Sequence, residues 1–185
     1  LIKGMELKRV VVTGLGAVTP LGLNVDETWE ALLNGVSGAG PITHFDASQF
    51  KTQFACEVKN FDPTLYLDKK EVRKFDRYAQ FAVAAAKEAV GDSALDLEKV
   101  DKNRVGVIFA AGIGGIRTFE EETSNYALHK ENGPKYNPFF IPKMISDIAA
   151  GQISIMYGFH GPNYATCSAC ATSTNAIADA FNLIR

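Results

Sequence analysis

Cys170 is the residue of this sequence best suited to covalent chemistry. It stands where a strand-like run, residues 163–169, gives way to a helical pattern that continues to Arg185. A thiol at such a turn meets the positive end of the helix and backbone N–H groups, which favour the thiolate and support a charged intermediate. The sequence therefore predicts a nucleophilic cysteine. The alternative is a small buried residue, the usual role of a free cysteine.

Cys167 and Cys170 also form a C-x-x-C pair, a spacing used in thiol redox sites and as half of a zinc site. A structural zinc takes four protein ligands, and the remaining candidates have no paired spacing; they are Cys56, His44, His129 and His160. Redox proteins normally place the attacking cysteine first, at the start of the helix. Metal binding is therefore not expected, and thiol redox chemistry is kept as an alternative hypothesis.

Two glycine turns follow apolar runs and suggest nucleotide binding at first sight. They are Gly14-Leu15-Gly16 and Gly112-Ile113-Gly114-Gly115. Both lack the third glycine of the dinucleotide fingerprint, and the sequence has no G-K-[ST] motif. We interpret both turns as places of close backbone packing and expect no cofactor.

A basic cluster precedes one of the predicted helices, and its spacing can place several positive charges on one helical face. It consists of Lys69, Lys70, Arg73 and Lys74. A solvated surface is the simplest interpretation of such a cluster. The net charge of -2 and the pI near 5.9 provide no general attraction to nucleic acid or to an anionic membrane.

Strands alternating with helices predict an α/β domain with a central sheet buried on both faces. A β-branched run at residues 8–16 indicates a buried first strand, and residues 105–111 indicate a second. Asn24 is a plausible helix N-cap. Helices are expected after Asn24, from Asp76 to Val90, from Glu120 to Lys130, from Ile141 to Tyr157, and after Cys170.

The composition is that of an ordinary soluble globular domain, with 185 residues, 46% hydrophobic and 22% charged. No apolar stretch reaches the roughly 18 residues that a membrane span needs. Residues 1–4 precede Met5 and have the character of an expression scar, which leaves residues 5–185 as one unit. Three cysteines without an export signal favour the reducing cytoplasm.

Four motifs, taken together and in order, resemble the β-ketoacyl-acyl-carrier-protein synthases, and in particular the type II condensing enzymes of bacterial fatty-acid synthesis. The motifs are Val10-Val11-Val12-Thr13-Gly14-Leu15-Gly16, Gly112-Ile113-Gly114-Gly115, Pro138-Phe139-Phe140-Ile141-Pro142 and Ser168-Ala169-Cys170-Ala171-Thr172. The resemblance implies the thiolase-like fold, a five-layer α-β-α-β-α sandwich in which residues 5–185 supply the first α/β half. Two histidines and a lysine that complete the family's active site are expected from the second half.

The resemblance also implies roles for individual residues. Cys170 matches the acyl-accepting nucleophile, and its backbone N–H would be one oxyanion donor. Ile113 matches the residue that gates the acyl pocket, and Phe140 matches one that reaches toward the partner subunit's pocket in a homodimer. The basic cluster of Lys69, Lys70, Arg73 and Lys74 matches a region that meets the acidic acyl carrier protein. Cys167 is not part of the family pattern.

The activity implied by the resemblance is a decarboxylative Claisen condensation. The acyl group on Cys170 would combine with malonyl carrier protein to give a β-ketoacyl product. A ketosynthase of a polyketide or other specialised pathway shares the cysteine motif and remains an alternative. A non-catalytic partner subunit, which sets chain length in this fold, would lack the nucleophile. We expect a polypeptide ending at Arg185 to be inactive alone, and no nucleic-acid or membrane partner is expected.

Overall fold

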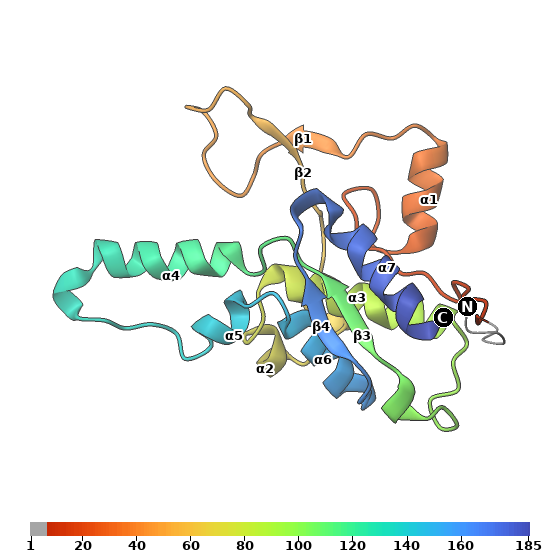
Figure 1. The fold of residues 1–185 in the computed structure, drawn as a ribbon. Coiled ribbons are helices and arrows are strands. Elements are labelled where there is room, and N and C mark those ends of the chain that lie inside the picture. The colour runs from red at the N-terminus through yellow and green to blue at the C-terminus, as the bar shows by residue number, and fades with distance from the viewer. Residues whose placement is uncertain (1–6) are drawn as a thin grey trace.

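The computed structural model describes residues 7–185, so the predicted expression scar at residues 1–4 lies outside the described part of the chain (Figure 1). Two strands form the sheet at its centre. Strand β3 (Val107–Ala110) pairs in parallel with β4 (Asn163–Thr166), with Val107 opposite Asn163 and Ala110 opposite Thr166. Both strands were predicted. Because the strands are parallel and in register, their carboxyl ends leave the sheet at the same edge.

Helices cover this sheet on its two faces. Helix α7 (Thr172–Ile184) lies on one face, and α6 (Ile148–Tyr157) lies on the other with α3 (Arg77–Asp92) packed against it (Figure 1). Val107 and Phe109 point from β3 toward the cluster that α3 and α6 form. The sheet is less buried than the sequence predicts. All four residues of β3 are half-buried, and Asn163 and Tyr164 of β4 are exposed, because the sheet has only two strands in residues 7–185 and both of its edges are open there.

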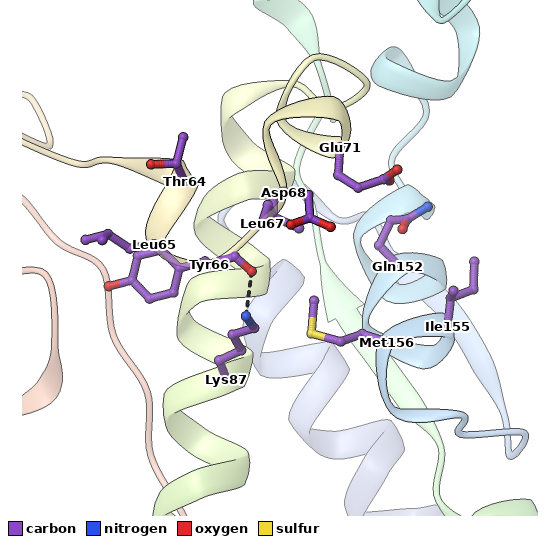
Figure 2. Close-up of a pocket in the computed structure, with 10 residues that line it drawn as sticks. All are labelled: Thr64, Leu65, Tyr66, Leu67, Asp68, Glu71, Lys87, Gln152, Ile155 and Met156. Carbon is purple, nitrogen blue, oxygen red and sulfur yellow. Dashed lines mark hydrogen bonds between the residues drawn. The ribbon is translucent and has the colours of Figure 1, made fainter.

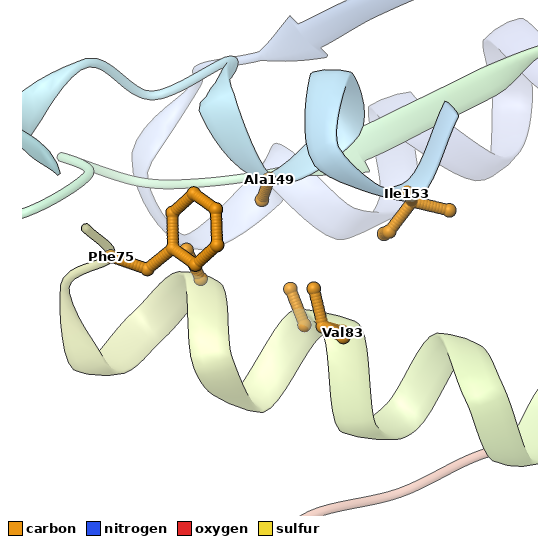
Figure 3. Close-up of a cluster of buried hydrophobic side chains, with 6 residues drawn as sticks. Phe75, Val83, Ala149 and Ile153 are labelled. Carbon is orange, nitrogen blue, oxygen red and sulfur yellow. The ribbon is translucent and has the colours of Figure 1, made fainter. Parts of the chain in front are cut away.

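Small side chains bring α3 and α6 close together, as the alanine-rich pattern of residues 76–90 predicts. The core consists of Phe75, Ala79, Ala82, Val83, Ala149 and Ile153 (Figure 3). Helix α3 begins at a capping carboxylate, because Oδ1 of Asp76 accepts a hydrogen bond from the N–H of Tyr78 at 3.2 Å. Helix α3 packs against α6, which in turn lies on the sheet.

The predicted first strand is wrong. Residues 8–16 form no strand, and Val11 and Val12 are 56% and 80% exposed. The segment instead lies along α3, whose carboxylates accept hydrogen bonds from its backbone N–H groups. Asp92 accepts from Leu15 N at 2.8 Å, and Glu88 accepts from Ala17 N at 2.9 Å. The interpretation of its glycines as close packing is confirmed. A Cβ on Gly16 would lie 1.9 Å from the carbonyl oxygen of Ala85.

The predicted helix from Ile141 to Tyr157 is two helices, α5 (Phe140–Met144) and α6. Donors from elsewhere in the chain form hydrogen bonds to the carbonyl groups at the break between the two helices. The N–H of Gly115 donates to Met144 O at 2.9 Å, and the hydroxyl of Tyr78 donates to Ile145 O. Tertiary hydrogen bonds thus end α5, and the chain restarts as α6.

The remaining elements surround this core. Helix α1 (Val25–Leu33) begins at the predicted cap, since Asn24 Oδ1 accepts from Glu27 N at 2.8 Å. Strands β1 (Ala39–Pro41) and β2 (Phe54–Cys56) form an antiparallel hairpin, and helices α2 (Lys69–Val72) and α4 (Ile116–Leu128) follow. The hairpin and α4 both extend away from the body of the molecule (Figure 1). No helix within residues 7–185 is long and apolar enough to cross a membrane.

Candidate active site

Cys170 lies in a sharp elbow between β4 and α7, as the sequence predicts. The strand ends at Thr166, a single 3-10 turn covers Ala169–Ala171, and α7 begins at Thr172. Ala169 has a φ of +48°, the left-handed conformation that side chains disfavour. Cys170 is exposed in this turn, so the interpretation of Cys170 as a small buried residue is wrong.

The glycine turn after β3 lies beside this elbow. Ala111 N donates to Thr166 O at 3.4 Å, and Cys167 Sγ donates to Gly112 O at 3.1 Å. The structure therefore brings together the segment with Cys170 and the turn with Ile113, which the sequence separates by more than 50 residues. Ile113 is 67% exposed at this turn.

Close backbone packing holds the glycine turn in place. A Cβ on Gly115 would lie 2.2 Å from Lys143 O, and one on Gly114 would lie 2.4 Å from Met144 O. The second glycine turn is thus also a packing site, as predicted. Its contacts are with α5, the short helix that begins at Phe140.

Phe140 is half-buried in a row of aromatic rings. Its ring stacks on Tyr136 with centroids 5.5 Å apart and on Phe119 of α4 with centroids 6.3 Å apart. Because α5 also contacts the glycine turn, Phe140 and Ile113 belong to one continuous structure at the carboxyl end of β3. The role of Phe140 toward a partner subunit stays a prediction.

The basic cluster occupies α2 and the residues that follow it. Lys69, Lys70 and Arg73 are exposed, whereas Lys74 pairs with Glu71 at 2.6 Å and lies 6.0 Å from the ring centre of Phe139. A buried side chain holds this short helix on α3. The Gln80 amide donates to Val72 O at 3.1 Å and to Phe75 O at 3.2 Å.

Helix α2 also carries acidic side chains, on the side where a surface hollow of about 470 Å³ lies (Figure 2). Asp68 and Glu71 line that hollow together with Gln152 and Met156 of α6. Hydrogen bonds from Thr64 hold the pKa of Asp62 below its usual range, and the charge of Lys69 lowers it further. The basic cluster is therefore part of a surface that carries charges of both signs. Lys70 and Arg73 are the cations of the cluster whose charge is least offset by neighbouring carboxylates.

The cysteines and histidines form no metal centre within residues 7–185, where no three His, Cys, Asp or Glu side chains are grouped to hold an ion. Cys56, Cys167 and Cys170 are all free and exposed. His44 lies 3.9 Å from Glu57 in the hairpin, and His129 bonds to Asn125 O at the end of α4. Neither histidine lies at the elbow.

A family model described as "Beta-ketoacyl synthase, N-terminal domain" matches residues 7–185. The chain belongs to the beta-ketoacyl synthase family. Curated relatives named 3-oxoacyl-[acyl-carrier-protein] synthase 2 are 43% identical in Synechocystis sp., 46% in Staphylococcus aureus and 48% in Coxiella burnetii. The matches cover 98%, 96% and 97% of this chain but only 43%, 42% and 43% of those relatives. The chain thus spans less than half the length of these synthases.

Solved ketosynthases have the same fold. The ishigamide ketosynthase/chain length factor matches with a TM-score of 0.83 and 24% identity, over 96% of this chain and 45% of that chain. A beta-ketoacyl synthase from Burkholderia phymatum STM815 matches with a TM-score of 0.77 and 23% identity, over 96% and 44%. These likenesses confirm the predicted thiolase-like α/β fold.

Two polar residues that organise this candidate site were not among the site residues predicted from the sequence. Asp76 was expected only as the start of a helix, yet its Oδ2 also accepts from the hydroxyl of Thr118 at 2.6 Å and from its N–H at 3.1 Å. These two hydrogen bonds connect α3 to α4 beside the glycine turn at residues 112–115. Thr172 is buried beside Cys170, and the sequence places it as the last residue of the motif at residues 168–172 but predicts no role for it.

Proposed function

We propose that this chain carries the nucleophile of a chain-elongating β-ketoacyl-acyl-carrier-protein synthase, with Cys170 as the acyl acceptor. The observation that carries the proposal is an exposed thiol in a strand-to-helix elbow, beside the glycine turn of Ile113, in a member of this family. The relatives at 43–48% identity are named 3-oxoacyl-[acyl-carrier-protein] synthase 2. Their names favour this reaction over a polyketide pathway.

In the first step, the Cys170 thiolate attacks the carbonyl carbon of an acyl thioester on the carrier protein. A new carbon–sulfur bond to Cys170 forms, the carbon–sulfur bond to the carrier protein breaks, and the carrier protein leaves as a thiolate. Amide dipoles at the start of α7 favour negative charge near this point, and the N–H of Cys170 is the proposed donor to the oxyanion. A thiolate suits this exchange because the enzyme thioester stays electrophilic.

In the second step, malonyl carrier protein loses carbon dioxide, and the electron pair that is freed forms a carbon–carbon bond to the acyl carbonyl. The carbon–sulfur bond to Cys170 then breaks, which releases β-ketoacyl carrier protein and regenerates the Cys170 thiolate. The histidines and the lysine that the family uses here have no counterpart at the elbow among residues 7–185. We propose that they belong to the part of the synthase that this chain does not span.

Ile113 is proposed to gate the acyl pocket, because its turn borders the elbow and Gly114 and Gly115 anchor that turn on α5. Phe140 is proposed to face the pocket of a partner subunit, next to the aromatic row that fixes its ring. Neither role needs a cofactor or a metal ion.

Two partners belong to this proposal. Lys69, Lys70, Arg73 and Lys74 are proposed to meet an acidic acyl carrier protein, since most of them are exposed on one short helix. The second proposed partner is another copy of the same protein, in a homodimer. Strand β4 pairs with β3 on one side and has no strand on its other edge within residues 7–185, so this edge is open to a second copy. In one solved relative, a type II PKS acyl-carrier protein is in complex with its ketosynthase. We place the synthase in the cytoplasm.

A condensation assay tests the function. The natural full-length protein, mixed with acyl- and malonyl-loaded carrier protein, should release carbon dioxide and form β-ketoacyl carrier protein. Cys170→Ala should abolish condensation, and residues 1–185 alone should not condense. Condensation by the Cys170→Ala variant at the wild-type rate would overturn the assignment. Rapid formation of a Cys167–Cys170 disulfide without acyl transfer would favour the redox alternative.

A further inference from the structure

Thr172 is the buried polar residue of the elbow. It is the first residue of α7 and only 4% exposed. Its hydroxyl makes two hydrogen bonds, accepting from the N–H of Ser168 at 2.9 Å and donating to the carbonyl of Ala169 at 2.6 Å. Both partners precede Thr172 in the chain, so the hydroxyl closes the turn that contains Cys170.

The two bonds enclose a strained residue. Ala169 has a φ of +48°, and a residue with a Cβ keeps this conformation only where its surroundings hold it. The Thr172 hydroxyl binds the chain at Ser168 N on one side of Ala169 and at the Ala169 carbonyl on the other. Cys170 follows directly, so the direction of its backbone N–H depends on the same turn.

Further bonds connect this turn to the strand and the helix. The hydroxyl of Thr166, the last residue of β4, donates to the carbonyl of Thr172 at 3.0 Å. The side-chain amide of Asn175 donates to Ser168 Oγ at 2.6 Å. The elbow is thus connected both to the end of the strand and to the second turn of α7.

An ordinary helix cap does not explain Thr172. A capping hydroxyl accepts from an N–H two or three residues later, inside the helix. Thr172 accepts from Ser168, four residues earlier, and α7 has no side-chain cap at its first turn. The hydroxyl therefore serves the elbow rather than the helix.

We propose that Thr172 is a positioning residue for the nucleophile. Its hydroxyl holds the left-handed turn at Ala169, which sets the direction of the Cys170 thiol and of the Cys170 N–H. The inference rests on the proposed role of Cys170 in acyl transfer. Thr172 itself does not touch the acyl group; it acts through the backbone.

The test compares Thr172→Val with Thr172→Ser in the natural full-length protein. Valine keeps the size and branching but removes both hydroxyl bonds, so that Ser168 N loses its partner while the Ala169 carbonyl keeps only its bond from the Thr172 N–H; serine keeps the hydroxyl. Iodoacetamide alkylation is followed by mass spectrometry at Cys170, with the exposed Cys56 as an internal reference, together with the rate of acyl transfer from an acyl thioester. We expect valine to slow both reactions at Cys170 about tenfold or more. Cys56 should be unaffected, and serine should restore both rates.

A second pair of variants covers the case in which Thr172→Val does not fold. Glycine adopts a positive φ without cost, so Ala169→Gly combined with Thr172→Val should fold and recover part of the Cys170 reactivity. Wild-type rates at Cys170 in folded Thr172→Val would overturn the inference, and so would a tenfold loss in Thr172→Ser. No acyl transfer to Cys170 in the wild type would instead overturn the proposed function, while the alkylation ratios would still decide the role of Thr172.

Discussion

The Sγ atom of Cys167 donates a hydrogen bond to the carbonyl oxygen of Gly112 at 3.1 Å. This bond joins the segment that leads to Cys170 with the turn that carries Ile113. The two segments leave neighbouring parallel strands at the same edge, where Ala110 is opposite Thr166. The proposed nucleophile and the proposed gate are therefore parts of one structure.

Cys167→Ser should leave acyl transfer to Cys170 within about twofold of the wild-type rate, because serine also donates to Gly112 and the chemistry needs only one thiol. Cys167→Ala should lower the free energy of unfolding by about 1 kcal/mol through the lost hydrogen bond. Acyl transfer kinetics and urea unfolding measure the two effects. A loss of all activity in Cys167→Ser would indicate that the pair of cysteines works together in redox chemistry.

Reversing charges on α2 should weaken recognition of the carrier protein. Lys70→Glu with Arg73→Glu should raise the KM for acyl carrier protein several-fold and reduce its dependence on salt, since exposed charges chiefly steer association. The reaction with a small acyl thioester should not change. Lys51→Glu with Lys59→Glu, which reverses two exposed charges at the hairpin and so gives the same change in net charge, is the matched control. An equal effect of the control would show that only net charge matters.

Two glycines should respond in opposite ways to substitution by alanine. Gly16→Ala would place a Cβ 1.9 Å from Ala85 O, so the segment must move off α3, at a cost of about 1–3 kcal/mol. Gly151 lies within α6 with nothing near its Cβ position, so Gly151→Ala should stabilise by up to about 1 kcal/mol. Thermal unfolding measures the stability of both variants. A Gly16→Ala variant more stable than the wild type would contradict the close packing of this segment on α3.

Local patterns predicted the elements whose surroundings agree with them. Helix α3 follows from its alanine spacing, and the elbow at Cys170 follows from small residues between a strand and a helix. The break at Ile145 could not be predicted, because a hydroxyl from Tyr78 and an N–H from Gly115 create it. The run at Val10–Val12 has strand-forming side chains, yet its neighbours Leu15 and Ala17 are bound by acids of α3. Periodicity contains no information about such distant partners.

The bond from Tyr78 also predicts a pH dependence. Burial raises the pKa of the Tyr78 hydroxyl above its usual 10.0, and the charges of Asp76 and Asp147 raise it further. The folded chain therefore keeps this proton when the unfolded chain loses it, so the free energy of unfolding falls as the pH rises above 10. Tyr78→Phe should lower the free energy of unfolding by about 1 kcal/mol at pH 8. Between pH 10 and 11, the free energy of unfolding of the variant should fall less steeply than that of the wild type.

Urea unfolding at a series of pH values measures both effects of Tyr78→Phe. Tyr157 and Tyr164 also have a raised pKa, so a shallow alkaline fall should remain in the variant. Parallel curves for wild type and Tyr78→Phe would contradict the assignment of this hydroxyl.

The most direct test of the central claim is the site of acylation. The natural full-length protein is incubated with an acyl thioester of the carrier protein, digested, and sequenced by tandem mass spectrometry, which separates Cys167 from Cys170 within one peptide. We expect a mass increase equal to the acyl group on Cys170 alone, which disappears on addition of malonyl carrier protein and is absent in Cys170→Ala. An acyl group on Cys56 or Cys167 instead, or none on any cysteine, would contradict it.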